Sequence, residues 1–81
     1  MIVFIDLDGT LTDTADICYK DLKDGLKDFN PSDIPLFPKA IEFISNLKSL
    51  GHRIVILSDS HPKYVRPIVE TFFNVEYIFS R

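Results

Sequence analysis

The chain opens on a short apolar run that is followed at once by two carboxylates and a glycine. Residues 2–5 are large and apolar, and Asp6, Asp8 and Gly9 come directly after them. An apolar run that ends in a polar, glycine-containing turn predicts a fully buried strand, central in a parallel sheet. Open α/β sheets bind ligands at the carboxyl ends of their strands. Because side chains at positions i and i+2 of a strand point the same way, we expect both carboxylates to face one spot.

Two further apolar runs predict two more strands. Residues 54–57 are β-branched or leucine throughout, and a third strand is predicted over residues 75–79, where Glu76 interrupts the pattern. The second strand ends in Ser58, which again places a small polar residue at a carboxyl end.

Three segments carry apolar residues at helical spacing. Residues 38–50 and 62–73 each begin with a proline, which suits the first turn of a helix. Residues 17–29 carry a similar stripe, and residues 12–14 offer three side chains that can cap its start. The alternation of strands and helices predicts an α/β fold with a three-stranded parallel sheet, βαβαβ, and right-handed crossovers.

The predicted strand order leaves part of the sheet uncovered. If the strands run in sequence order, both crossover helices lie on one face. The strand sequences are nevertheless apolar, as in strands that are covered on both faces. We therefore expect this chain to form half of a doubly wound sheet, with one face and one edge of the first strand bare.

Composition restricts the classes of protein to which the chain can belong. Its 81 residues make one domain at most, and its single cysteine, Cys18, fits a reducing compartment such as the cytoplasm. No signal-peptide pattern is present, and no apolar run reaches the roughly 20 residues of a membrane span. The formal net charge of −3 comes from mixed signs rather than a basic stripe, so a nucleic-acid partner is not indicated.

The polar residues at the strand ends suggest a chemistry by themselves. Two carboxylates can hold a hard cation, of which Mg²⁺ is usual near phosphates. One carboxylate can attack phosphorus as a nucleophile, and its neighbour can serve as general acid and base. The hydroxyl of Ser58 is expected to bind a phosphate oxygen. The alternative for an isolated Asp-x-Asp sequence is a solvated turn.

Two motifs resemble those of the haloacid dehalogenase (HAD) superfamily. Residues 6–14 resemble its motif I, and residues 54–60 resemble its motif II strand. The helix at residues 37–51 is similar to the one before motif II in phosphoglycolate-phosphatase-like members. The resemblance implies an HAD-like Rossmannoid core over residues 1–81, with a short C1 cap inserted at about residues 15–36. It also implies an Mg²⁺-dependent phosphohydrolase that forms an aspartyl-phosphate intermediate.

The resemblance implies roles for five residues. Asp6 corresponds to the phosphate-accepting nucleophile and a metal ligand. Asp8 corresponds to the general acid/base and lends its carbonyl to the metal. Thr10 supports the geometry of motif I, and Ser58 binds the transferring phosphoryl group. Asp59 is a further candidate for substrate binding, and its alternative is a turn residue that caps the following helix. Next to it, Ser60 is a candidate to support the residues that contact the substrate.

The chain departs from the family pattern beyond its third strand. The motif III lysine and the motif IV acidic pair follow that strand in the family, and neither is found before Arg81. Lys63 and Arg66 are candidates to supply the missing charge, although helix-surface cations are usually solvated. We therefore expect a complementary polypeptide segment or a homodimer. The alternative function is a non-catalytic regulatory or interaction module that dimerises through its exposed sheet edge. The phosphorylated substrate is not identified by the sequence.

Overall fold

The computed structural model describes residues 1–80, which form a three-stranded parallel sheet in the order β1–β2–β3. β1 spans Ile2–Asp6, β2 spans Arg53–Ser58 and β3 spans Glu76–Phe79. The predicted βαβαβ topology and the parallel pairing of all three strands are confirmed.

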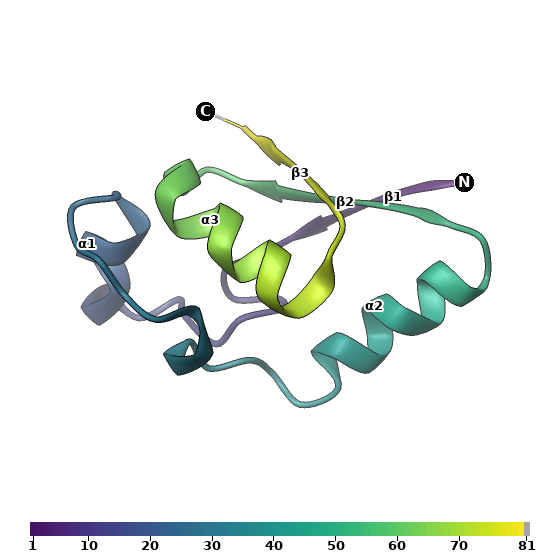
Figure 1. Ribbon diagram of the computed structural model, residues 1–81, viewed down its shortest axis with the longest axis horizontal. Helices are drawn as coiled ribbons and strands as arrows, with labels where there is room; N and C mark the ends of the chain where they lie inside the picture. The colour runs from purple at the N-terminus through teal and green to yellow at the C-terminus, as the bar shows by residue number, and fades with distance from the viewer. Residues whose placement is uncertain (81) are drawn as a thin grey trace.

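Both crossover helices lie on the same side of this sheet (Figure 1). α2 spans Ala40–Ser49 and connects β1 to β2, while α3 spans Pro62–Ile68 and continues as a π-helical turn over Val69–Phe73 before β3. Helix–sheet packing is therefore confined to one face, as the strand order predicts.

α2 ends at Ser49, and the chain turns away from the helix at Gly51, the residue that was predicted to stop it. This glycine has φ +84, so the chain leaves the helix in a left-handed conformation that disfavours side chains. The N–H of Gly51 donates to the carbonyl of Lys48 at 3.0 Å, and the N–H of His52 donates to that of Leu47 at 3.2 Å. These two bonds form a Schellman motif, which satisfies carbonyls that the helix end would otherwise leave open.

The hydrophobic core lies between the sheet and the two crossover helices. On the strands, every second side chain points into this layer, which is why Ile5, Ile54 and Ile56 are buried. The helices contribute six further large buried side chains, and the segment between β1 and α2 contributes three. Those on the helices are Ile44, Tyr64, Val65, Ile68, Val69 and Phe73, and those in the segment are Leu7, Leu11 and Ile34.

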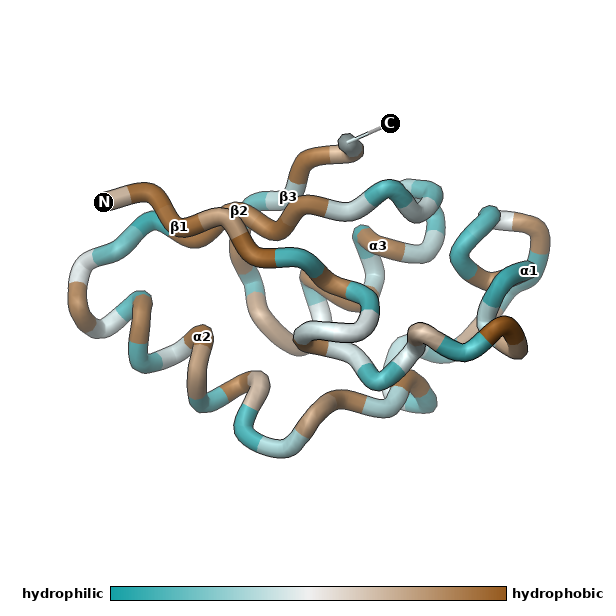
Figure 2. The backbone as a smooth tube through the Cα atoms, turned by 180° about the vertical axis from the view of Figure 1, so that it is seen from behind, coloured by the Kyte–Doolittle hydropathy of each residue, from teal (hydrophilic) through white to brown (hydrophobic). Residues whose placement is uncertain are grey.

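The opposite face of the sheet carries apolar side chains that no described helix covers. Figure 2 shows apolar residues along the strands, and Ile2 and Phe4 on β1 are 49% and 57% exposed. The prediction that the first strand is central and fully buried was therefore wrong for residues 1–80. In this part of the chain β1 is an edge strand that is covered on one face only. The prediction of a bare face and a bare edge of β1 is confirmed.

The stripe at residues 17–29 does not form the helix that its spacing predicts. Only a 3₁₀ turn, Ile17–Tyr19, and a four-residue helix, α1 at Lys20–Lys23, are present. Gly25, at φ +76, turns the chain away from the helical path. A second 3₁₀ turn, Pro31–Asp33, follows before α2. The apolar stripe is split as a result, because some of its members pack on the core while others remain exposed.

In residues 1–80, no helix has the length and apolar character needed to cross a bilayer.

Candidate functional site

Asp6 is the last residue of β1 and lies at the carboxyl end of the sheet. It pairs in register with Leu57 of β2, and its side chain is exposed. One carboxylate oxygen, Oδ1, accepts a hydrogen bond from the N–H of Leu7 at 3.0 Å. The sheet thus presents the Asp6 carboxylate to solvent at the edge where parallel α/β sheets bind their ligands.

A tight turn after Asp6 changes the direction of the chain. The carbonyl of Leu7 accepts hydrogen bonds from the N–H groups of Thr10, Leu11 and Thr12 at 3.3, 2.9 and 3.0 Å. Gly9 has φ +78, and its N–H donates to the carbonyl of Thr12 at 2.8 Å. Strand alternation therefore stops at Asp6, and the position of Asp8 is set by this turn.

The carboxylate of Asp8 is surrounded by hydroxyl groups. Its Oδ1 accepts hydrogen bonds from Thr14 at 2.5 Å and from Tyr64 at 2.8 Å, with Thr12 further away at 3.4 Å. Its Oδ2 accepts from Ser60 at 2.9 Å. Hydrogen bonds to a charged acceptor are stronger than those between neutral groups, so this cluster holds the Asp8 side chain in one place.

The two threonines of this cluster had another predicted role. Thr12 and Thr14 are both fully buried, and their hydroxyls lie 2.6 Å apart beneath Asp8. The prediction that they cap the following helix was wrong. The helical turn that follows is capped by Asp16, whose side chain accepts a hydrogen bond from the N–H of Cys18 at 3.1 Å.

Tyr64, on the first turns of α3, was missed by the sequence analysis. It is fully buried, and its ring lies against Phe29 with a centroid separation of 5.5 Å. Burial raises the pKa of the Tyr64 hydroxyl far above its ordinary value, and the hydrogen bond to Asp8 and the charge of Asp8 raise it further. The hydroxyl therefore stays protonated and donates to Asp8 at neutral pH. No local sequence signal marks this hydroxyl as a partner of Asp8, because the two residues are 56 positions apart.

The structure separates the roles of the two serines after β2. Ser58 is 3% exposed, and its Oγ accepts the N–H of Ser60 at 3.1 Å. The hydroxyl of Ser60 in turn donates to Asp8. Ser60 rather than Ser58 is therefore the residue that connects the segment after β2 to the carboxylate of Asp8, in the turn after β1. A phosphate contact from Ser58 stays a prediction.

The other two predicted site residues, Thr10 and Asp59, are both exposed. Thr10 lies within the turn that carries Asp8. Asp59 does not cap α3, because the Nδ1 of His61 accepts the N–H of Lys63 at 3.1 Å and fills that role. Asp59 instead lines an open cavity of about 430 Å³ beside Ser60. The other residues around this cavity come from the segment before and within α1, and they are Ala15, Asp16, Ile17, Lys20, Lys23 and Asp24.

The candidate cations on α3 point toward other groups. The Nε of Arg66 donates to the hydroxyl of Tyr77 on β3 at 3.1 Å. Lys63 is exposed and lies with Arg66 and Asp28 around a separate surface cavity. The arrangement favours the solvated alternative for both side chains.

The residues present offer a partial set of ligands for a metal ion. Within residues 1–80, no group of three or more histidine, cysteine or acidic side chains is placed to hold a metal. The exposed carboxylate of Asp6 can act as a ligand, whereas both oxygens of Asp8 already accept hydrogen bonds. Mg²⁺ usually keeps several waters and needs only one or two carboxylates. The Asp6 carboxylate can provide one such ligand, and a contribution from the carbonyl of Asp8 stays a prediction.

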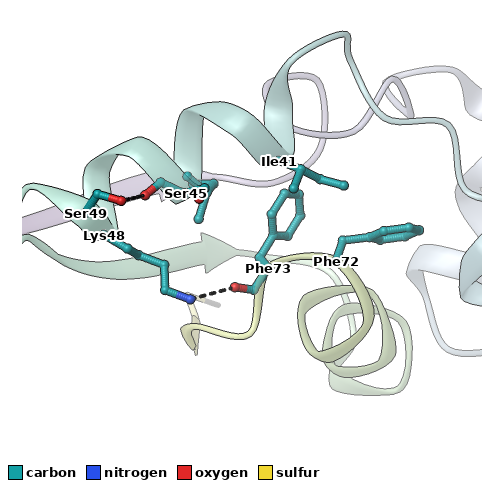
Figure 3. A pocket seen from close by; sticks show the side chains of 7 residues that line it. Ile41, Ser45, Lys48, Ser49, Phe72 and Phe73 are labelled. Carbon is teal, nitrogen blue, oxygen red and sulfur yellow. Dashed lines mark hydrogen bonds between the residues drawn. The ribbon is translucent and has the colours of Figure 1, made fainter.

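A second groove lies at the opposite end of the sheet, between α2 and the π-helical turn (Figure 3). It measures about 450 Å³. The ammonium of Lys48 donates to the carbonyls of Phe73 and Asn74 at 3.3 and 3.4 Å and so satisfies the end of that turn. The one cation of this groove therefore has a structural role, and no carboxylate accompanies it.

Comparison with protein-family models finds no match to this sequence, and no curated protein is significantly similar to it. The function must therefore be inferred from the residues themselves.

Proposed function

We propose that this chain carries the nucleophilic half of an Mg²⁺-dependent phosphohydrolase that acts through an aspartyl phosphate on Asp6. One observation carries the proposal: an exposed carboxylate ends β1 at the ligand-binding edge of a parallel sheet, two residues before a carboxylate fixed by hydroxyls. The resemblance of residues 6–14 to motif I of the HAD superfamily supports the same chemistry.

The proposed reaction proceeds in two displacements. A carboxylate oxygen of Asp6 forms a bond to phosphorus as the ester oxygen leaves, and Asp8 gives that oxygen a proton. Asp8 then takes a proton from the water that attacks the acyl phosphate, which restores Asp6 and releases phosphate. Hydroxyl groups accept as well as donate, so Ser60 and Tyr64 can adjust to both protonation states of Asp8. Mg²⁺, held by Asp6 and the carbonyl of Asp8, would offset the charge of the phosphoryl group.

The cavity beside Ser60 is the proposed location of the organic part of the substrate. Its lining carries both lysines and aspartates, which favours a small polar phosphate ester over an apolar one. Thr10, Ser58 and Asp59 remain the proposed substrate contacts. A complementary polypeptide segment would supply the lysine and the additional acids that the resemblance implies, and the single cysteine, Cys18, suits a site in the cytoplasm.

Hydrolysis of p-nitrophenyl phosphate with Mg²⁺, by the chain alone and after mixing with any polypeptide that co-purifies with it, tests this proposal. Asp6→Asn should lower the rate at least about 100-fold, because an amide is a far weaker nucleophile than a carboxylate. Asp13→Asn is the matched control, since Asp13 is also exposed and follows in the same loop. Equal rates for the wild type and Asp6→Asn would refute the proposal.

A second candidate function is a non-catalytic module that dimerises. The exposed apolar side chains on the bare face of β1 favour it. Sedimentation equilibrium distinguishes the two candidates, because the dimerising module must self-associate. This second candidate also predicts no turnover of a phosphate ester.

A further inference from the structure

Tyr64 is the largest fully buried residue in the described part of the chain, and it brings a hydroxyl into the core. A phenylalanine would fill almost the same space without burying a polar atom, and a buried hydroxyl costs free energy unless it is hydrogen-bonded. The hydroxyl of Tyr64 has a partner in Asp8, 2.8 Å away, in the turn that follows β1. Its presence therefore calls for an explanation beyond packing.

The position of this hydroxyl is fixed from two directions. The backbone N–H of Tyr64 donates to the carbonyl of His61 at 2.9 Å in the first turn of α3, which anchors the start of the side chain. The ring packs against Phe29, which limits its movement within the core. A tyrosine side chain has only two rotatable bonds that place its ring, so both ends of Tyr64 are held.

Tyr64 and Ser60 hold the two oxygens of Asp8 from one segment of the chain. Tyr64 donates to Oδ1 and Ser60 donates to Oδ2, and both residues belong to the segment that follows β2. The threonines, by contrast, reach only Oδ1 and lie in the same loop as Asp8. Rotation of the carboxylate would therefore break at least one bond to the β2–α3 segment.

We infer that Tyr64 is a positioning residue, whose hydroxyl selects the side-chain rotamer of Asp8. Its kinetic consequence rests on the proposed function: Asp8 exchanges a proton with the leaving oxygen and with water, and misplacing it slows those steps without weakening substrate binding. The rotamer preference itself does not depend on any activity.

The direct test measures the three-bond Hα–Hβ couplings of Asp8 by NMR. The wild type should show the unequal couplings of one rotamer, and Tyr64→Phe should show averaged couplings. Tyr77→Phe is the matched control, because Tyr77 also loses a hydroxyl that has one side-chain partner, Arg66, at the exposed surface. A purely structural role for Tyr64 would lower the melting temperature and leave the Asp8 couplings unchanged, and that result would overturn the inference.

Two further measurements keep the test decisive. If Tyr64→Phe does not fold, the hydroxyl proton of Tyr64 can be followed by NMR instead. It should exchange slowly with solvent in the wild type and rapidly in Asp8→Asn. A Tyr64 hydroxyl proton that exchanges rapidly in the wild type would overturn the inference. With p-nitrophenyl phosphate, Tyr64→Phe should lower kcat about tenfold at unchanged KM, as expected for the loss of one hydrogen bond to a charged group. Should Asp6→Asn keep full turnover, the proposed function fails, while the couplings still decide the role of Tyr64.

Discussion

Hydroxyl groups gather around Asp8 because each of them needs a partner inside the core. Thr12, Thr14 and Tyr64 are fully buried, and Ser60 is 3% exposed. A carboxylate offers several acceptor sites on its two oxygens, so one aspartate can satisfy several donors at once. Asp8 thus stabilises the fold in addition to its proposed role as general acid and base.

Two features of the structure favour glycine at position 25, namely its left-handed backbone conformation and the close approach of His61. At φ +76, a side chain is strained, and an added Cβ would lie 2.7 Å from Cγ of His61. Gly25→Ala should therefore lower the free energy of unfolding by more than about 2 kcal/mol, the upper end of the cost of a left-handed alanine. Urea denaturation followed by circular dichroism measures the change.

Gly51→Ala distinguishes the cost of the left-handed backbone from the cost of the contact with His61. Gly51 has φ +84 but no heavy atom within 4 Å of an added Cβ, so only the backbone cost applies, about 1–2 kcal/mol. Equal losses for the two variants would show that the contact between Gly25 and His61 has no influence on stability.

Sequence reasoning located the carboxylates and named Ser60 as a candidate near them, but it identified neither Tyr64 nor the hydrogen bond from Ser60 to Asp8. Asp6 and Asp8 are recognisable because an apolar strand and a glycine turn surround them within a few positions. Tyr64 and Ser60 lie 56 and 52 positions from Asp8, and nothing local marks their hydroxyls as its partners. Helical spacing predicted that residues 62–73 form an amphipathic helix, but Tyr64 was not among the residues assigned to its buried face. The spacing pattern cannot distinguish a tyrosine whose hydroxyl has a function from one that only fills space in the core.

At the scale of whole elements, apolar spacing predicted a helix correctly where the apolar residues also pack against the rest of the fold. α2 buries Ala40 and Ile44 and α3 buries Tyr64, Val65 and Ile68, and both helices appear near their predicted bounds. The stripe over residues 17–29 has the same spacing, but Ile17 and Leu26 are 81% and 76% exposed. Short helices depend on packing for most of their stability, so a stripe with a left-handed glycine inside it yields only one turn.

Arg53 and Glu76 connect β2 to β3 on the bare face of the sheet. The Nε and Nη2 atoms of Arg53 donate to the two carboxylate oxygens of Glu76 at 2.6 and 2.8 Å. These hydrogen bonds, and the positive charge, hold the pKa of Glu76 below its ordinary value of 4.5. Glu76 therefore interrupts the apolar pattern of β3 without weakening the pairing of the strands.

The pH dependence of this pair has a definite sign. Because the folded pKa of Glu76 is lowered, its stabilising contribution is present above the ordinary value of 4.5 and is lost as pH falls through the folded pKa. Arg53→Met should raise the titration midpoint of the Glu76 carboxyl, followed by carbon NMR, and its stability deficit should vanish in acid. Lys20→Met, which breaks the ion pair with Asp24, should leave that midpoint unchanged. A midpoint unaffected by Arg53→Met would contradict the prediction.

The whole molecule has two unequal faces. One face of the sheet is covered by α2 and α3, whereas the other exposes Ile2, Phe4 and Ile78. In residues 1–80, β1 is also an open edge strand. Its first four residues are apolar and include no charge or proline of the kind that usually prevents edge pairing, and its only charge is at its end, Asp6. Exposed apolar surface and an open edge together predict association, with a second copy or with a complementary segment.

Phe4→Lys tests this prediction, because Phe4 is 57% exposed and its replacement leaves the core intact. In sedimentation equilibrium the wild type should associate, and Phe4→Lys should weaken the association at least about tenfold, since it removes a large apolar side chain and adds a charge to the contact. Leu50→Lys is the matched control: Leu50 is 73% exposed but lies at the end of α2, away from the bare face. A wild type that stays monomeric at high concentration would leave a complementary segment as the only predicted occupant of this face. Association that Phe4→Lys and Leu50→Lys disturb equally would show that the contact lies elsewhere.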